Sequence, residues 1–321
     1  MDNLRRLGSS FSIRIPPDDD GFTGRECPSS ECLGYFKIEF GTGLKGEDLP
    51  CHCPYCGETA PHDQYWTPAQ IEYAKSAALR KVQDAIHQDL KKLEFDYRPS
   101  GGFGIGLSMK VKPGSLPPIH YYREKRLETE VLCDHCTLRY SVYGVFAFCP
   151  DCGRHNSLQI LRKNFEVIEK MLDLAAGLDG ELAEKLIENA LEDCVSSFDG
   201  FGREIVRVLW REAATLAEAE KVSFQNLDSA RRNLKKLFKL DLGGGLTAEE
   251  WQAAVRGFQK RHVLSHKMGV ADAEYIRKSG DVEAVIGRKV VVNVEEVREL
   301  AQIIGKLAGD MVTRVRRAEG S

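Results

Sequence analysis

The chain has 321 residues, of which 29% are charged, a formal net charge of −3 and ten cysteines. This length exceeds what one hydrophobic core usually holds, so we expect two or three domains. The nearly balanced charge gives no global attraction to nucleic acid or to a membrane surface, so any site for a polyanion must be local.

The sequence predicts a cytoplasmic protein with no membrane partner. No apolar run approaches the roughly 20 residues that a membrane helix needs, and residues 1–14 lack the apolar stretch of a secretory signal. Thiols stay reduced in the cytosol, where paired cysteines in a chain of this length more often bind metal than form disulfides.

The first cysteine group lies in the segment 11–62, which we interpret as a zinc ribbon. Its ligands are predicted to be Cys27, Cys32, Cys53 and Cys56. The C-x4-C and C-x2-C spacings both fall within those of zinc ligands. Cys51 and His52 are competing ligands, but the C-P-x-C-G pattern at Cys53 repeats in the second group and favours the pair Cys53 and Cys56.

The segment 63–130 is expected to hold one long helix and short strands. Thr67 and Pro68 form a helix start, and apolar residues recur at helical spacing from Ile71 to Leu93. Alternation over 103–111 predicts a half-buried strand, and a second strand is expected over 120–132. The glycine patterns at 41–46 and 101–106 do not lead from a strand into a helix, so neither is interpreted as a phosphate loop.

A second zinc ribbon is predicted over the segment 131–156. Two C-x2-C pairs separated by twelve residues supply its ligands, which are Cys133, Cys136, Cys149 and Cys152. A site with four cysteine ligands has no open coordination position, so we expect two structural zinc ions in the chain and no catalytic metal. The ribbons could contact nucleic acid, bind a protein partner or only stabilise the fold.

From about residue 157 to the end, the apolar residues follow helical spacing. Thr247 and Glu250 form a capping box, and Asn293 can cap a final helix. The segment 157–321 is therefore predicted to be an all-α domain, and the whole chain is predicted to be α+β, with short antiparallel strands in its N-terminal half.

One group of residues in the helical half could be catalytic, and its members are Arg261, His262 and His266. His266 could take the proton from a ribose 2′-hydroxyl or protonate the leaving oxygen, and Arg261 could stabilise the negative charge of the phosphorane. That reaction needs no metal. Residues five apart on a straight helix lie about 140° apart around its axis, so Arg261 and His266 would need a helix break or a second protomer to meet.

Arg261-His262-x-x-x-His266 resembles the motif of the HEPN superfamily, whose helical nuclease domains carry an Arg, a polar residue, a few more residues and a His. The run from Met268 to Asp272 with Tyr275 is similar to one HEPN-like group. The resemblance covers about 180–317 and is strongest at 247–276. It implies a metal-independent endoribonuclease, a homodimer that brings two motifs together, and a role in defence or toxin-like RNA cleavage. Some members of the superfamily retain only the fold.

Other interpretations of the motif stay open. His262 follows Phe258 by one helical turn and could be an interior histidine, while Arg261 could be a surface charge. His262 and His266 could also place two imidazoles on one face as metal ligands, although the glutamate of the H-E-x-x-H pattern is absent.

A predicted helix over 230–240 is the candidate RNA-binding element. Five cations and no acid occur within nine residues, and these are Arg231, Arg232, Lys235, Lys236 and Lys239. Such a stripe repels itself unless a polyanion or an acidic helix offsets it, and the stretch 181–193 is a candidate neighbour. The stripe could equally be the solvated face of an amphipathic helix.

These observations lead to two hypotheses. The first is a metal-independent endoribonuclease in which a helical dimer cuts RNA through Arg261 and His266, while the zinc-bearing half selects the RNA or a protein partner. The second is a non-enzymatic zinc-ribbon adaptor whose helical domain dimerises and binds nucleic acid or protein.

Overall fold

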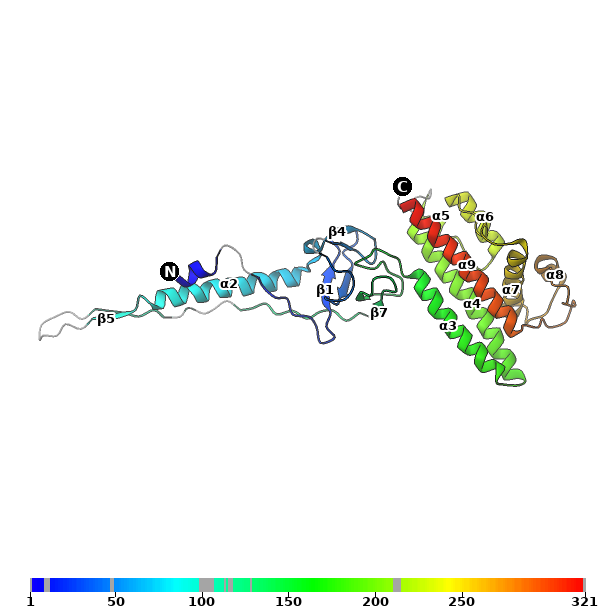
Figure 1. Cartoon of the computed structure of the whole chain (residues 1–321), viewed down its shortest axis with the longest axis horizontal. Helices are drawn as coiled ribbons and strands as arrows, with labels where there is room; N and C mark the ends of the chain where they lie inside the picture. Colours follow the sequence, from blue (N-terminus) through cyan, green and yellow to red (C-terminus); the bar gives the residue numbers. More distant parts are fainter. Residues whose placement is uncertain are drawn as a thin grey trace, which may run out of the picture. The chain divides into compact units, whose positions relative to one another are not determined.

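The computed structural model describes residues 2–8, 12–46, 49–97, 107–112, 114, 118–127, 129–209 and 215–319. The chain divides into two compact units, Met1–Arg154 and His155–Ser321, here called the cysteine-rich unit and the helical unit (Figure 1). The fold is α+β, because about half of the chain is helical and the sheets are small and antiparallel. Among the helices described, none combines enough length with enough hydrophobicity to cross a bilayer.

A four-stranded antiparallel sheet lies at the centre of the cysteine-rich unit. In spatial order its strands are β1 (Thr23–Glu26), β2 (Tyr35–Ile38), β8 (Arg139–Val142) and β7 (Thr129–Leu132). The register of β2 and β8 places Lys37 opposite Ser141. Strands from 11–62 thus pair with strands from 131–156, and a single core contains both cysteine groups. The two segments that were predicted as separate zinc ribbons therefore share one sheet.

A second sheet in this unit is the hairpin of β3 (Pro50–His52) and β4 (Thr59–Pro61), which continues into the 3₁₀-helix η1 (His62–Tyr65). The long helix α2 (Pro68–Lys91) follows, as the sequence predicts. Its capping box joins Thr67 and Gln70, which satisfies backbone donors at the helix start. The short helix α1 (Asp2–Arg6) packs on α2, where Asp89 accepts the N–H groups of Asn3 and Leu4.

The apolar stripe of α2 is largely exposed within the described chain. Ile71, Leu79, Ile86 and Leu90 face solvent, whereas the buried side chains of this helix are those of Gln70, Ser76, Ala85 and Asp89. Periodicity therefore predicted the helix correctly but does not identify the face that this chain buries. The buried Gln70 is satisfied, since its amide donates to the carbonyl of Gly24 and to Glu124.

Two strands were predicted after α2. In the first, the described residues form β6 (Leu107–Met109), which pairs with β5 (Phe95–Tyr97), and residues 103–106 of the prediction lie outside the described residues. The second predicted strand, over 120–132, is shorter than expected. It is limited to β7, and residues 120–127 pair with no strand in the part of the chain that the structure describes. Side chains hold that segment instead: Glu124 accepts the N–H of Gly24 and the hydroxyl of Tyr35, and the His120 N–H donates to Ser76.

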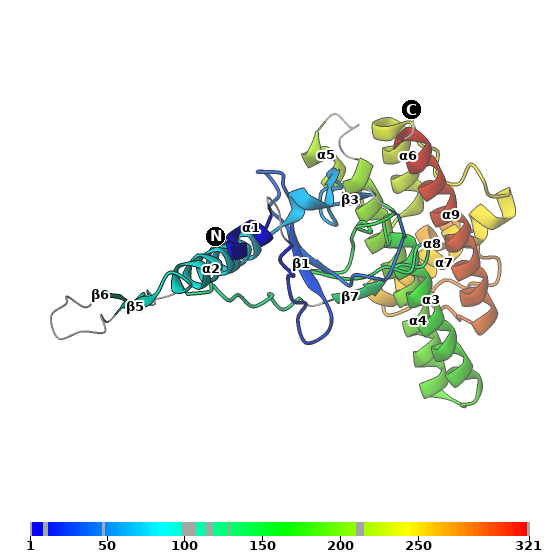
Figure 2. The ribbon, with the colours of Figure 1, turned by 60° about the vertical axis from the view of Figure 1, so that its left-hand side comes forward.

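Helices make up the second unit, as the sequence predicts. They are α3 (Ser157–Ala176), α4 (Glu181–Leu209), α5 (Leu216–Glu220), α6 (Leu227–Phe238), α7 (Ala248–His266), α8 (Ala273–Ser279) and α9 (Val294–Glu319). Helices α3, α4 and α9 run side by side (Figure 2). Phe198 on α4 lies at the centre of the core, with its ring centroid 5.7 Å from that of Phe224 and 6.2 Å from that of Phe258.

Candidate functional site

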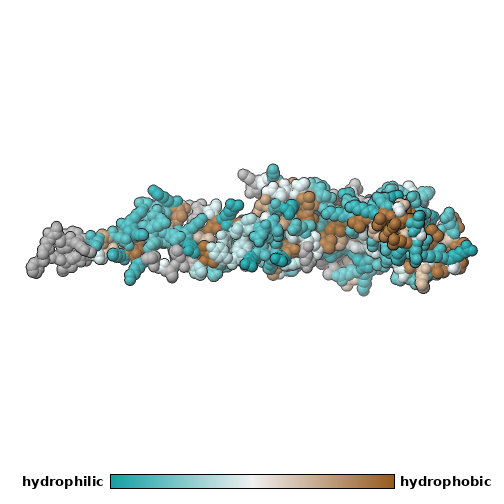
Figure 3. Space-filling model, turned by 90° about the horizontal axis from the view of Figure 1, so that it is seen from below, coloured by the Kyte–Doolittle hydropathy of each residue, from teal (hydrophilic) through white to brown (hydrophobic). Residues whose placement is uncertain are grey.

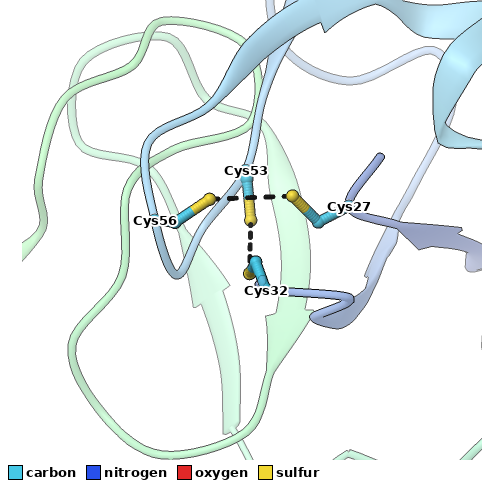
Figure 4. Close-up of side chains that lie close together, drawn as sticks. All are labelled: Cys27, Cys32, Cys53 and Cys56. Carbon is cyan, nitrogen blue, oxygen red and sulfur yellow. Dashed lines mark hydrogen bonds between the residues drawn. The ribbon is translucent and has the colours of Figure 1, made fainter. Parts of the chain in front are cut away.

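The first cysteine group converges in space. The Sγ atoms of Cys27 and Cys56 are 3.6 Å apart, and those of Cys32 and Cys53 are 3.7 Å apart (Figure 4). All four sulfurs lie within 4.8 Å of one another. Four thiolates that surround a zinc ion tetrahedrally, each about 2.3 Å from it, are about 3.8 Å apart. The donor set and spacing therefore fit one zinc ion.

The second group has the same geometry. The Sγ atoms of Cys133 and Cys152 are 3.7 Å apart, those of Cys136 and Cys149 are 3.4 Å apart, and the four sulfurs again lie within 4.8 Å of one another. The structure thus brings together all eight cysteines that the spacing selected, in two clusters that could hold two zinc ions. With four cysteine ligands each, neither leaves an open coordination position for a substrate.

Tight backbone turns present the cysteines of each C-x2-C pair. The Gly57 N–H donates to the carbonyl of Cys53, and the Gly153 N–H donates to the carbonyl of Cys149. Both glycines have positive φ, 74° and 66°, which a residue with a Cβ adopts only with strain. The Tyr55 N–H donates to the sulfur of Cys53, a contact that favours the thiolate needed for metal binding.

Two other thiols, those of Cys51 and Cys194, lie outside both clusters, as does the imidazole of His52. Cys51 is fully buried, and burial raises the pKa of its thiol to about 12, so it stays protonated at neutral pH. The Nδ1 atom of His52 is 2.9 Å from the hydroxyl of Thr59. Cys194 is buried in the core of the helical unit.

The two histidines of the candidate motif lie on the last turns of α7. This helix begins with the predicted capping box, in which Thr247 and Glu250 exchange side-chain and backbone hydrogen bonds. His262 and His266 are one turn apart and exposed, and their ring centroids are 5.0 Å apart. A single protomer therefore presents two adjacent imidazoles to solvent.

Arg261 lies on a different side of α7. Its side chain is only 7% exposed, and no described residue accepts a hydrogen bond from its Nε. The separation agrees with helical geometry, which places residues five apart about 140° from each other. The structure thus brings the two histidines together and buries the arginine.

The electrostatic surroundings of the imidazoles are positive. The pKa of His262 is lowered from its ordinary value, first by burial and then by the nearby charges of His266, Lys267, Arg261 and Lys278. Each cation disfavours a further positive charge on the ring. His262 is therefore neutral at pH 7 and can accept a proton.

The predicted basic helix exists as α6, but it ends at Phe238 and Lys239 is its C-cap residue with a positive φ of 54°. The five cations of the stripe are also not equivalent. Arg231 is paired with Asp241, with its Nε 2.8 Å from Oδ1, and its guanidinium lies 4.8 Å above the centroid of the Trp251 ring. The remaining four cations of the stripe are exposed, and these are Arg232, Lys235, Lys236 and Lys239. The acidic stretch 181–193 was a candidate neighbour for this stripe. Its Glu188 pairs instead with Lys289, whose Nζ lies 2.7 Å from Oε1 of Glu188.

One buried charge network was missed from the sequence. The Nζ of Lys260 is 2.7 Å from Oε1 of Glu296, 2.7 Å from the carbonyl of Val291 and 3.9 Å from Asp281. The hydroxyl of Tyr275 donates to Asp281 at 2.5 Å. Because these residues are up to 36 positions apart, no local pattern signals the network. It ties the loop 280–293 to α7 beside Arg261.

Comparison with known proteins finds no matching family model, no matching curated protein and no matching solved structure. The HEPN resemblance therefore depends on the motif of α7 and its helical setting. The prediction of two zinc sites depends on the spacing of the cysteine sulfurs.

Proposed function

We propose that the helical unit is a metal-independent, HEPN-like endoribonuclease and that the cysteine-rich unit selects its RNA or a protein partner. The observation that carries the proposal is the pair of exposed imidazoles with ring centroids 5.0 Å apart. A neutral base and an adjacent acid are the two groups that cleavage at a ribose 2′-hydroxyl requires.

In the proposed reaction, neutral His262 takes the proton of the 2′-hydroxyl. The 2′-oxygen then forms a bond to phosphorus while the bond from phosphorus to the 5′-oxygen breaks. His266 acts as the general acid and gives a proton to that leaving oxygen, so the products are a 2′,3′-cyclic phosphate and a free 5′-hydroxyl. The lowered pKa of His262 supports its assignment as the base, since an unprotonated ring is needed at neutral pH.

Arg261 would act through its charge. Its guanidinium is a permanent cation whose charge favours neutral His262 and would attract the negatively charged phosphorane. The exposed cations of α6 would hold more distant phosphates. Arg231 contacts Trp251 on α7, and Trp251 precedes His262 by eleven residues, which is about 16 Å along a helix.

A homodimer forms part of the proposal. Exposed apolar side chains surround the end of α7, and these are Met268, Val270, Val282, Val285, Ile286 and Val291. Brown patches interrupt the teal surface of the helical unit (Figure 3). Large exposed apolar areas mark contact surfaces more often than free surface, which supports association of two copies next to the imidazoles.

A second candidate function is a non-enzymatic adaptor in which the cysteine clusters and the helical unit serve only as binding surfaces. The burial of Arg261 favours it, because a side chain that is 7% exposed has little direct access to a phosphate. The two functions differ in whether RNA is cut when the histidines are intact.

The test is incubation of the purified full chain with mixed RNA in EDTA. Wild type is compared with His262→Ala, His266→Ala and the control His87→Ala, which removes a histidine from α2. We expect cleavage by wild type and the control, and a loss of at least 100-fold in either motif variant, as for removal of a general acid or base. Equal cleavage by all four proteins would refute the proposed site, and RNA binding without cleavage would favour the adaptor.

A further inference from the structure

A cavity of about 800 Å³ opens in the cysteine-rich unit next to the metal clusters. Residues of the segment 38–46 form one wall, β4 and η1 form another, and Leu138 and Asp151 come from the second cysteine group. Its size falls within the roughly 300–1,000 Å³ of small-ligand sites. Neither the proposed cleavage reaction nor the metal clusters use this cavity.

The glycine loop at 41–46 builds the cavity wall. The Leu44 N–H donates to Oδ2 of Asp151 at 2.9 Å. Gly43 has a φ of 82°, and a Cβ there would lie 2.0 Å from the same oxygen, so only glycine permits this approach. The pattern that resembles a phosphate loop therefore fastens the loop to a carboxylate, which would repel a phosphate.

Hydrogen-bond acceptors dominate the polar lining. Asp63 is exposed and forms no ion pair with any described residue, whereas Glu39 is neutralised by Arg139. The Nδ1 atom of His62 is buried and has no hydrogen-bond partner in the described chain. Apart from that imidazole, the basic lining side chain is Lys45. The acidic side chains of Asp63 and Asp151 line the cavity beside this lysine, so the polar lining suits a ligand with positive charge and several N–H donors.

The apolar lining suits a flat group on an aliphatic stem. Phe40 is 56% exposed and stands beside Leu44 and Leu49 in the wall. The guanidinium of Arg25 lies 4.8 Å from the centroid of the Phe40 ring. A planar cation therefore already stacks on this ring, and its exposed area leaves room for a second one.

We propose that this cavity binds an arginine side chain of a partner protein. A guanidinium supplies five N–H donors in a rigid plane, carries a permanent charge and stacks on aromatic rings. Asp151 and Asp63 receive the charge, and Phe40 and Leu44 cover the stem. The carboxylates disfavour RNA as the occupant, so the inference is independent of the proposed nuclease activity.

The test measures binding of blocked tripeptides to the full chain by calorimetry, with arginine, lysine or citrulline as the central residue. Citrulline keeps the shape of arginine but has no charge. We expect the arginine peptide to bind with a dissociation constant of about 1 mM or tighter, and the citrulline peptide at least tenfold more weakly. Asp63→Asn and Phe40→Ala should each weaken binding severalfold, whereas Asp19→Asn, an exposed aspartate outside the cavity, should not.

Asp151→Asn is a further variant, and its zinc content is measured first because Asp151 lies between two cysteines of the second cluster. If Asp151→Asn loses metal, the binding measurements on Asp63→Asn and Phe40→Ala still test the proposal. Equal affinity for the arginine and citrulline peptides, or unchanged affinity in both of these variants, would overturn the proposal. Displacement of the arginine peptide by a short single-stranded RNA would reassign the cavity to nucleic acid and also overturn it.

Discussion

Replacing Lys260 with methionine tests whether the buried charge network holds the helical unit together. Methionine keeps the aliphatic stem but removes the ammonium group, which bonds to Glu296 and to the carbonyl of Val291. The variant leaves Asp281, whose side chain is 11% exposed, with Tyr275 as its side-chain partner among the described residues. A buried carboxylate that loses its cation is strongly destabilising.

The size of the effect follows from the burial of each partner. Removing one member of a fully buried ion pair costs about 3–5 kcal/mol. Glu296 is 32% exposed and can regain water, so we expect a loss of about 2–4 kcal/mol in the free energy of unfolding. For a unit of this size, that loss lowers the melting temperature by about 5–15 °C.

The assay is thermal unfolding followed by circular dichroism at the helical band, with Lys306→Met as the control. Lys306 is 59% exposed and pairs with Glu250 on the surface, so its loss should cost less than about 1 kcal/mol. If Lys260→Met lowers the melting temperature no more than Lys306→Met does, the buried charges do not hold the helical unit together. Asp281→Asn added to Lys260→Met should recover part of the loss, because it removes the unpaired charge.

Three further predictions concern the metal, the motif and the basic helix. Metal analysis should give two zinc ions per chain, with one lost in Cys149→Ser and none in Cys51→Ser; a wild-type ratio near zero under reducing conditions would contradict the two-zinc account. Because the pKa of His262 is lowered in the folded state, the acidic limb of RNA cleavage should lie below pH 6.5, the ordinary value for histidine. The stability that neutral His262 contributes should be present above that pH and should decrease as the pH falls. An acidic limb above pH 6.5 would contradict the assignment of His262 as the base. Lys235→Glu combined with Lys239→Glu should weaken RNA binding and reduce the log-log salt slope by about 1.4, or 0.7 per lost contact, and an unchanged slope would show that the stripe is only solvated surface.

The elements with local signals could be predicted from the sequence. The cysteine spacing selected the eight residues that converge in two clusters, since each C-x2-C pair closes within one turn. The cap at Thr67 followed by Pro68 and the capping box at Thr247 correctly predicted the starts of α2 and α7. Helical periodicity likewise predicted the all-α second unit, because its apolar faces pack in one core.

Features that depend on distant contacts could not be predicted in this way. The pairing of β2 with β8 joins residues about 100 positions apart, and nothing in either strand indicates that the two cysteine groups share a sheet. The apolar stripe of α2 gave no sign that Gln70 and Asp89 would be the buried side chains. Asp151 and His62, which both line the cavity, are 89 residues apart, and no sequence pattern indicates that they meet.

The central claim is that the helical unit cleaves RNA through the ribose 2′-hydroxyl, with His262 and His266 moving the protons. The most direct measurement uses two copies of one short RNA, identical except for a single 2′-deoxy sugar at the cleavage position, with products identified by mass spectrometry. The account predicts that the all-ribose RNA yields a 2′,3′-cyclic phosphate and that the deoxy-substituted RNA stays intact at that position. Equal cleavage of both RNAs there, or a product with a linear 3′-hydroxyl end, would contradict it.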